Sequence, residues 1–113
     1  MPTIDEYSFG RIVVDGEERT RDVILLPGRL VTNWWRANGH ILVLADLADV
    51  LEELPERLLV GTGAYAQMRP EPETLEQLRK RGVEVEALPT DEAVQRYGEL
   101  DPAHTAAALH LTC

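Results

Sequence analysis

The hydrophobic period of the chain changes at Asp46, and this change constrains the fold more than any other feature. Four apolar residues after Asp46 recur at helical spacing and predict one face of a helix that ends before Pro55: Leu47, Val50, Leu51 and Leu54. The next segment, Leu58–Val60, is short and wholly apolar, which is typical of a strand buried on both faces. A helix followed at once by a buried strand indicates an α/β chain.

Further helices and strands alternate after this point. Pro72, or the capping pair Thr74 and Gln77, marks the start of a second helix, and Gly82 marks its end. The segment 83–86 alternates valine with glutamate and predicts a strand with one solvated face.

Thr90 predicts the N-cap of a third helix that ends before Pro102. Ala106–Leu111 is again apolar and predicts the last strand. This alternation implies right-handed crossovers and a mixed, mostly parallel sheet.

The N-terminal part predicts strands without a helix. Tyr7–Val14 contains three β-branched residues, and Asp15-Gly16 is a strong hairpin signal, so Arg21–Leu26 is expected as the return strand. Leu30–Trp35 continues in extended conformation. The expected order is β-β-β-α-β-α-β-α-β, with the N-terminal hairpin added to the sheet of a single domain, residues 1–113.

Charge and composition exclude several classes of function. The chain has 20 acidic and 11 basic residues, a net charge of −9, and the bases are scattered, so we expect no nucleic-acid partner. The longest apolar run, Ile41–Ala45, is far shorter than the about 20 residues of a membrane helix. The first ten residues contain Asp5 and Glu6 and no base, and Cys113 is the single cysteine. Both observations favour a cytoplasmic location.

Six short segments are similar, in order and spacing, to those of a known family. They are Tyr7-Ser8-Phe9-Gly10, Asp15-Gly16, Trp35-Arg36 with Gly39-His40, Val60-Gly61-Thr62-Gly63, Thr90 with Glu92-Ala93-Val94, and His110-Leu111-Thr112-Cys113. The chain resembles, over nearly its whole length, the adipogenesis-associated Mth-type domain family, which includes a mitochondrial complex I assembly factor. The resemblance implies a three-layer β/β/α fold, a mostly unknown molecular function, and assembly or regulatory partners for some animal members. It implies no agreed set of catalytic residues.

The segment Gly61–Ala66 matches the dinucleotide-binding pattern G-x-G-x-x-G/A directly after a predicted strand, and Glu84 and Glu86 follow about 20 residues later. That pattern binds a pyrophosphate only when a helix opens at once, and Pro70 and Pro72 oppose a long helix there. We therefore expect a turn that leaves a buried strand, and no cofactor.

A weaker ligand hypothesis remains for the same edge of the sheet. Ligands gather beyond the carboxyl ends of parallel strands, and this edge would bring together Gly61, Thr62, Gly63 and Thr90. The first amides of the helix at Thr90 would favour a small anion or nucleotide, with Arg69 as counter-charge. The alternative is that Thr90 only caps its helix.

Metal and nucleophile chemistry find little support. His110 and Cys113 are three residues apart, so they point to opposite faces of a strand, and they are fewer than the ligands of a zinc site. His40 and His104 would join them only if the fold brought them close. Ser8 is the only serine, and a terminal cysteine is usually mobile. We expect no metal and no catalytic residue.

Trp34, Trp35 and Arg36 are candidates for an interaction surface. Neighbouring residues of a strand face opposite ways, so one ring can enter the core while the other lies outside. An exposed tryptophan beside an arginine is typical of a contact hot spot. The alternative is that both rings are covered within the domain.

The sequence therefore favours a cytoplasmic, non-enzymatic protein-interaction or assembly domain, either with protein partners or as a homodimer. The alternative is a domain or enzyme that binds a small anion or nucleotide near Gly61, Thr62, Gly63 and Thr90.

Overall fold

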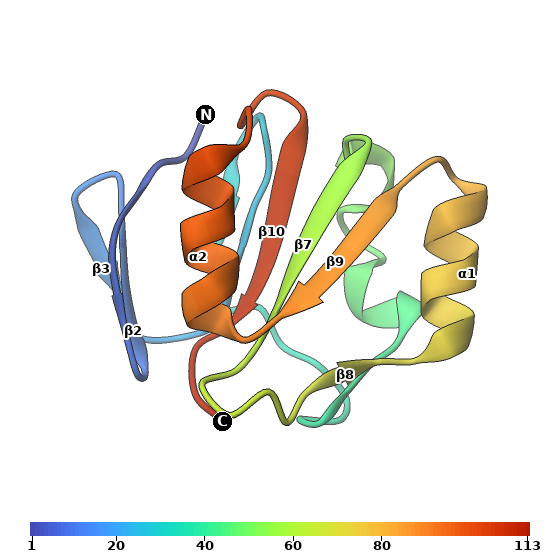
Figure 1. The fold of residues 1–113 in the computed structure, drawn as a ribbon, viewed down its shortest axis with the longest axis horizontal. Coiled ribbons are helices and arrows are strands. Elements are labelled where there is room, and N and C mark those ends of the chain that lie inside the picture. Colours follow the sequence, from blue (N-terminus) through green and yellow to red (C-terminus); the bar gives the residue numbers. More distant parts are fainter.

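A five-stranded sheet forms the centre of the molecule. The computed structural model describes residues 1–113. The strands of this sheet are β4 (Val23–Leu25), β5 (Leu30–Val31), β7 (Arg57–Thr62), β9 (Glu84–Leu88) and β10 (Thr105–His110). They lie in the order β5-β4-β10-β7-β9 (Figure 1). The strands β10, β7 and β9 are parallel, whereas β4 and β5 are antiparallel to their neighbours.

Strand β10 occupies the middle of the sheet because it is apolar on both faces. All six of its residues are buried. Ala106 and Ala108 belong to the core on one face, and Ala107 and Leu109 belong to the core on the other. A strand of this kind is stable only when both faces are covered, which requires a layer on each side of the sheet.

One covering layer consists of α2 and a separate N-terminal sheet. This sheet contains β1 (Ile4–Ser8), β2 (Arg11–Val14) and β3 (Glu17–Arg19), and α2 comprises Thr90–Glu99. Ile12 and Val14 from β2 join Ala93 and Tyr97 from α2 in one buried cluster on this face.

The other layer contains α1 (Pro72–Lys80), two 3₁₀ turns (Leu44–Leu47 and Leu51–Glu53) and the short pair β6 (Ile41–Leu42) and β8 (Arg69–Pro70). Leu47, Met68 and Leu78 pack here against the sheet. The predicted α/β class, with a mixed sheet and an added N-terminal hairpin, is confirmed.

The hairpin lies where Asp15-Gly16 predicts it, but its return strand differs. Glu17–Arg19 pairs with β2, and the predicted return strand, Arg21–Leu26, instead supplies β4 beside β10. The whole of β4 is buried, and a strand that is apolar on both faces finds two covering layers only in the central sheet. The predicted strand Tyr7–Val14 is also divided, because the chain turns at Gly10, whose φ is +74°.

The predicted helix between Asp46 and Pro55 is wrong, because this segment forms only the two 3₁₀ turns. The Asp46 carboxylate accepts hydrogen bonds from the backbone N–H groups of Val43, at 3.0 Å, and Ala37, at 3.2 Å, and so holds the first turn in place. Val50 has φ −122°, which interrupts any continuous helix. Leu47 and Val50 are nevertheless buried, so the apolar stripe correctly indicates which residues face the core.

The other two helices are confirmed. Helix α1 begins at Pro72, and Gly82 follows its end with φ +83°. No helix opens after Gly63, as predicted. Helix α2 begins at Thr90, but the Thr90 side chain does not cap it.

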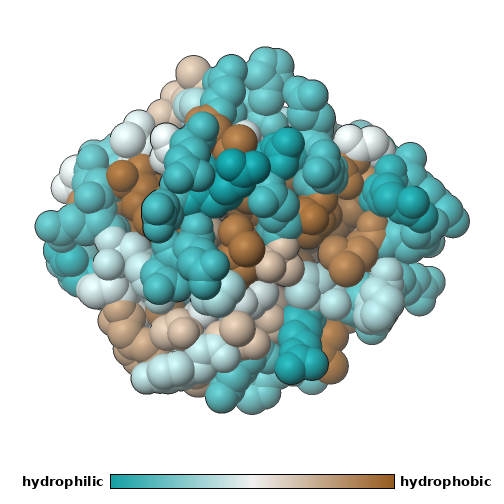
Figure 2. All heavy atoms as spheres, in the orientation of Figure 1, coloured by the Kyte–Doolittle hydropathy of each residue, from teal (hydrophilic) through white to brown (hydrophobic).

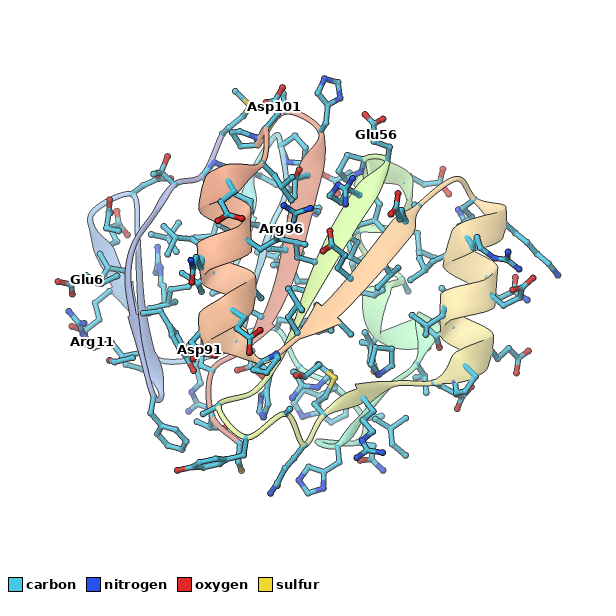
Figure 3. The ribbon with its side chains drawn as sticks, viewed as in Figure 1. Glu6, Arg11, Glu56, Asp91, Arg96 and Asp101 are labelled. Atoms are coloured by element: carbon cyan, nitrogen blue, oxygen red, sulfur yellow. The ribbon has the colours of Figure 1, made fainter.

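The side of the molecule seen in Figure 2 is mainly hydrophilic, with small separate apolar areas. Charged side chains point outward on the same side of the molecule (Figure 3). Arg11 binds Glu6 at 2.9 Å on the N-terminal sheet, and Arg96 of α2 binds Glu86 at 3.3 Å. Neither helix has the length and apolar character of a membrane span.

Two glycine substitutions test the packing at opposite ends of α2. Gly63 has φ +103°, and a Cβ there would lie 2.5 Å from the carbonyl oxygen of Cys113, so Gly63→Ala should lower the free energy of unfolding by at least about 2 kcal/mol. Gly98 lies in α2 with free space around it, so Gly98→Ala should raise the free energy of unfolding by about 0.5 kcal/mol. Urea unfolding measures both, and equal effects of the two variants would contradict this packing.

Candidate functional site

A surface cavity of about 470 Å³ lies where β4 begins and β10 ends. Asp22, Arg36 and His110 line it and are largely buried, whereas Arg21 and Trp35 line it and are exposed. The segment before β4, the segment after β5 and the end of β10 each contribute side chains. The cavity therefore combines buried charge with an accessible opening, which is typical of a functional site.

The register of the sheet brings Asp22 and His110 together. Val23 pairs with Leu109 in the antiparallel β4–β10 ladder, so the next residues of the two strands face each other on the same side of the sheet. The backbone N–H of Trp34 then donates to the carbonyl of Asp22 at 2.9 Å. This bond holds the returning chain against β4 and lets the Arg36 side chain reach the pair.

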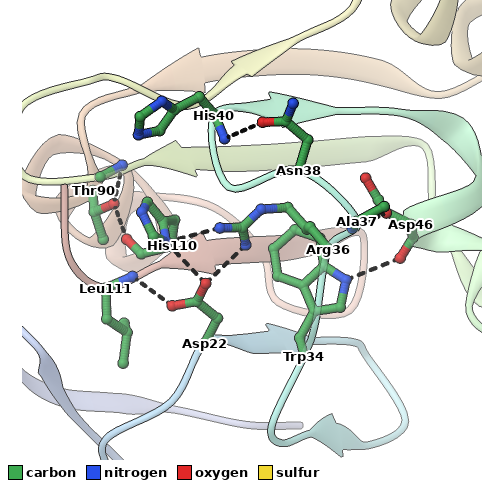
Figure 4. A network of polar contacts seen from close by, with 11 residues as sticks. Asp22, Trp34, Arg36, Ala37, Asn38, His40, Asp46, Thr90, His110 and Leu111 are labelled. Carbon is green, nitrogen blue, oxygen red and sulfur yellow. Dashed lines mark hydrogen bonds and ion pairs between the residues drawn. The ribbon is translucent and has the colours of Figure 1, made fainter.

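The three side chains form one hydrogen-bonded cluster (Figure 4). Arg36 Nη1 donates to Asp22 Oδ2 at 2.8 Å, and Arg36 Nη2 lies 3.0 Å from His110 Nδ1. His110 Nδ1 also lies 2.8 Å from Asp22 Oδ2, and the other oxygen, Oδ1, accepts from the backbone N–H of Leu111 at 2.8 Å. Asp22 thus binds both partner side chains and the end of β10.

A single nitrogen of His110 meets two groups that require opposite roles. When Nδ1 carries a proton, it donates to Asp22, and when Nδ1 is bare, it accepts from Arg36. Either tautomer preserves the ion pair between Asp22 and Arg36. His110 Nε2 makes no hydrogen bond within the chain.

The pKa of Asp22 lies below its usual value. Burial raises this pKa, but the hydrogen bonds from His110, from the Leu111 backbone and from Arg36 lower it further than burial raises it. The carboxylate is therefore ionised at neutral pH and balances the buried guanidinium of Arg36.

Trp34 is buried and Trp35 is exposed, so the alternative in which both rings are covered is wrong. The two residues follow β5 and do not lie on a strand, so the predicted strand Leu30–Trp35 is shorter than expected. Trp34 is only 9% exposed, its indole N–H donates to the carbonyl of Asp46 at 2.9 Å, and the Arg36 guanidinium lies 4.9 Å from its ring centre. Trp35 is 77% exposed. Of the three candidates for an interaction surface, Trp35 alone offers its side chain to a partner, while Trp34 and Arg36 hold the backbone around it.

The structure brings Gly61, Gly63 and Thr90 together, but their polar groups bind one another. The Thr90 hydroxyl accepts from the Gly63 N–H at 2.8 Å and donates to the His110 carbonyl at 2.5 Å. The Thr62 hydroxyl donates to the Leu88 carbonyl at 3.0 Å. A Cβ on Gly61 would meet Leu109 and Thr90 side chains within about 3 Å, so this glycine allows close packing.

These four residues are all buried, and none of them lines the larger surface cavities. Arg69 is exposed and forms no ion pair. Anion binding at this edge stays a prediction, and the observed hydrogen bonds give Thr90 a structural role between β7 and β10.

The remaining candidates lie apart. No group of three histidine, cysteine or acidic side chains lies close enough together to hold a metal ion. His104 is exposed and lies 2.7 Å from Glu56, and Cys113 is half-buried with a free thiol.

Sequence reasoning missed Asp22. The available signal was an acidic residue directly before the apolar segment Val23–Leu26, at the point where a buried strand begins.

Replacement of Asp22 should change the acid limb of the stability curve. Asp22→Asn leaves the buried Arg36 without its counter-charge, so the free energy of unfolding at pH 7 should fall by about 3 kcal/mol. The pKa of Asp22 is lower in the folded chain than in the unfolded chain, where it is about 3.9. Asp22 therefore stabilises the folded chain at pH values above about 3.9, and this stabilisation is lost as the pH falls through the folded-state pKa. Between pH 5 and pH 2, wild type should therefore lose more stability than the variant.

Urea unfolding at each pH measures this difference. Glu52→Gln is the control, because the Glu52 side chain is 91% exposed, and its curve should run parallel to that of wild type. Parallel curves for Asp22→Asn and wild type would show that Asp22 does not act in this way.

Two substitutions at Thr90 isolate its hydroxyl. Thr90→Val leaves the Gly63 N–H and the His110 carbonyl without their buried partner, which should cost about 2 kcal/mol of unfolding free energy. Thr90→Ser keeps the hydroxyl and should lose less than half as much. Equal losses in thermal or urea unfolding would exclude this bridging role.

Known protein structures resemble this chain over nearly its whole length. A family model described as protein of unknown function (DUF498/DUF598) matches residues 4–110. The crystal structure of a conserved hypothetical protein from Pyrococcus horikoshii OT3 is 31% identical and matches with a TM-score of 0.82, covering 98% of this chain and 99% of that chain.

Two more distant structures show the fold alone. A Bordetella pertussis protein described as a Mth938-like domain is 24% identical, covers 97% of this chain and 85% of that chain, and has a TM-score of 0.76. A Bartonella henselae protein described as an outer membrane protein is 23% identical, covers 99% and 96%, and has a TM-score of 0.84. The family match extends over nearly the whole chain and confirms the resemblance to Mth-type domains: this chain belongs to the family of proteins of unknown function (DUF498/DUF598), with the Mth938-like fold.

Proposed function

We propose that this chain is a small cytoplasmic, non-enzymatic domain that binds a protein partner and acts in assembly. The exposure of Trp35 carries the proposal. A tryptophan that is 77% exposed places a large apolar ring in water, and such rings are frequent energetic centres of protein interfaces.

The backbone on both sides of Trp35 is held in place. Trp34 is fixed by its bond to Asp46, and Arg36 is fixed by Asp22 and His110. An exposed side chain on an ordered backbone loses little conformational freedom when a partner binds, which favours affinity.

Two more exposed aromatic rings lie near the end of β10. Phe9 is 57% exposed and Tyr65 is 70% exposed, and their ring centres are 6.2 Å apart. Their sequence neighbours lie close to Thr112, since a Cβ on Gly10 would lie 3.9 Å from the Thr112 side chain and the Ala64 N–H donates to the Thr112 carbonyl. Thr112 also lines the cavity beside Trp35. Aromatic residues are enriched at interfaces, so this end of the molecule is the favoured partner surface.

The net charge of −9 favours a different protein over a second copy. Two copies would bring like charges together, whereas a neutral or basic partner would not. A homodimer is therefore the competing outcome, and sedimentation velocity across a range of concentrations distinguishes it from a monomer.

The alternative, a small-anion or nucleotide site at Gly61, Thr62, Gly63 and Thr90, receives less support. Thr90 and Thr62 already use their hydroxyls in internal hydrogen bonds. The potential nucleophiles are few, since the chain contains one serine and one cysteine.

Capture of partners from the native cytoplasm tests the proposal. Trp35→Ala should reduce recovery of the specific partner by at least about tenfold, as expected when a hot-spot side chain is removed. Leu75→Ala is the matched control, because Leu75 is also an exposed apolar residue but lies on α1. Equal recovery with wild type and both variants would exclude Trp35 as the contact, and unchanged melting temperatures would show that both variants are folded.

A further inference from the structure

The charged side chains that line the cavity beside Trp35 have a net charge of +1. Asp22 and Arg36 neutralise each other at 2.8 Å. Arg21, which directly precedes Asp22, lines the same cavity and forms no ion pair, although the chain has 20 acidic residues. Glu18, which shares a neighbouring hollow with Arg21, is bound to Arg11 at 3.1 Å.

Several hydrogen-bonding groups of the cavity have no partner in the chain. The Nε of Arg36 is fully buried and unpaired, and a planar guanidinium has five N–H groups, of which only two meet Asp22 and His110. His110 Nε2 and the Asn33 side chain make no hydrogen bond within the chain. Asn33 also has a left-handed backbone conformation, with φ +54°, and turns the chain directly before Trp34.

We propose that this cavity is a binding site for a small organic acid, whose single carboxylate group is held by Arg21 and the Arg36–His110 pair. This inference concerns a small ligand and does not depend on the protein partner proposed above. Nothing in the Gly61–Thr90 edge contributes to it, because those residues do not line this cavity.

The charge of the site favours a monocarboxylate over phosphate. With neutral His110, the lining residues Arg21, Asp22 and Arg36 sum to one positive charge, which matches one carboxylate. A phosphate dianion would leave an unbalanced negative charge next to the ionised Asp22. Arginine also binds planar carboxylates in bidentate geometry.

The volume of the cavity and the residues that line it indicate the size and the apolar character of the ligand. About 470 Å³ is at the lower end of the volumes of small-molecule sites, so a compact acid fits and a dinucleotide does not. The exposed ring of Trp35 lines the opening and offers an apolar surface to the body of the ligand. Benzoate has both features, a planar carboxylate and a flat apolar ring.

An NMR titration tests the site with benzoate, acetate and inorganic phosphate, each compared with sodium chloride at the same ionic strength. Benzoate should give a saturable shift of the Trp35 indole N–H. The backbone N–H of Leu75 serves as an internal reference, because Leu75 lies on α1 and does not line this cavity. Acetate should shift the same residues more weakly, since it lacks the ring that contacts Trp35.

Two arginine variants locate the charge. Arg21→Gln should weaken benzoate binding by about tenfold or more, because it removes a charge-assisted hydrogen bond. Arg69→Gln is the matched control, since Arg69 is likewise exposed and forms no ion pair but lies outside the cavity, and it should change the affinity less than twofold.

Three results would overturn the proposal. Absence of a saturable shift at tens of millimolar benzoate would exclude the site. Loss of binding with Arg69→Gln but not with Arg21→Gln would move the anion to the Gly61–Thr90 edge. Tighter binding of phosphate than of either carboxylate would exclude the ligand class.

Discussion

The burial of β10 on both faces is the constraint on which the rest of the molecule depends. Its six residues lie between two apolar cores, so the sheet needs a cover on each side, and the N-terminal sheet with α2 supplies one while α1 with the 3₁₀ turns supplies the other. The same strand places His110 opposite Asp22 and lets the Thr90 hydroxyl join its carbonyl to Gly63. The central position of β10 therefore determines both the packing of the two layers and the location of the candidate site.

The cluster of Asp22, Arg36 and His110 shows how this fold tolerates charge at its core boundary. Burying a guanidinium is unfavourable unless an opposite charge and hydrogen bonds compensate for lost water, and here a carboxylate, a ring nitrogen and an indole face all contact it. An apolar trio of equal volume could pack as well. A charged trio beside an open cavity instead maintains a polar wall that water or a ligand can reach, which is why the cluster is more informative about function than about stability.

Local patterns predicted the later elements well, because their signals are contained in the segments themselves. Pro72 and Gly82 bound α1, and the apolar run at Ala106–Leu111 marks β10. The helix after Asp46 failed because its carboxylate binds backbone groups that a helical-period argument does not consider. The candidate site was even harder to predict from the sequence. Asp22 and His110 are 88 residues apart, and only the register of β4 against β10, which no local pattern specifies, makes them neighbours.

The order of the strands has a consequence for biosynthesis. Strand β10 is translated after every other element, yet it lies between β4 and β7. Until it leaves the ribosome, the emerging polypeptide has no central pairing partner for either strand, and their apolar faces lack a finished sheet. The joining of β4 and β7 into one sheet therefore waits until β10 has been synthesised.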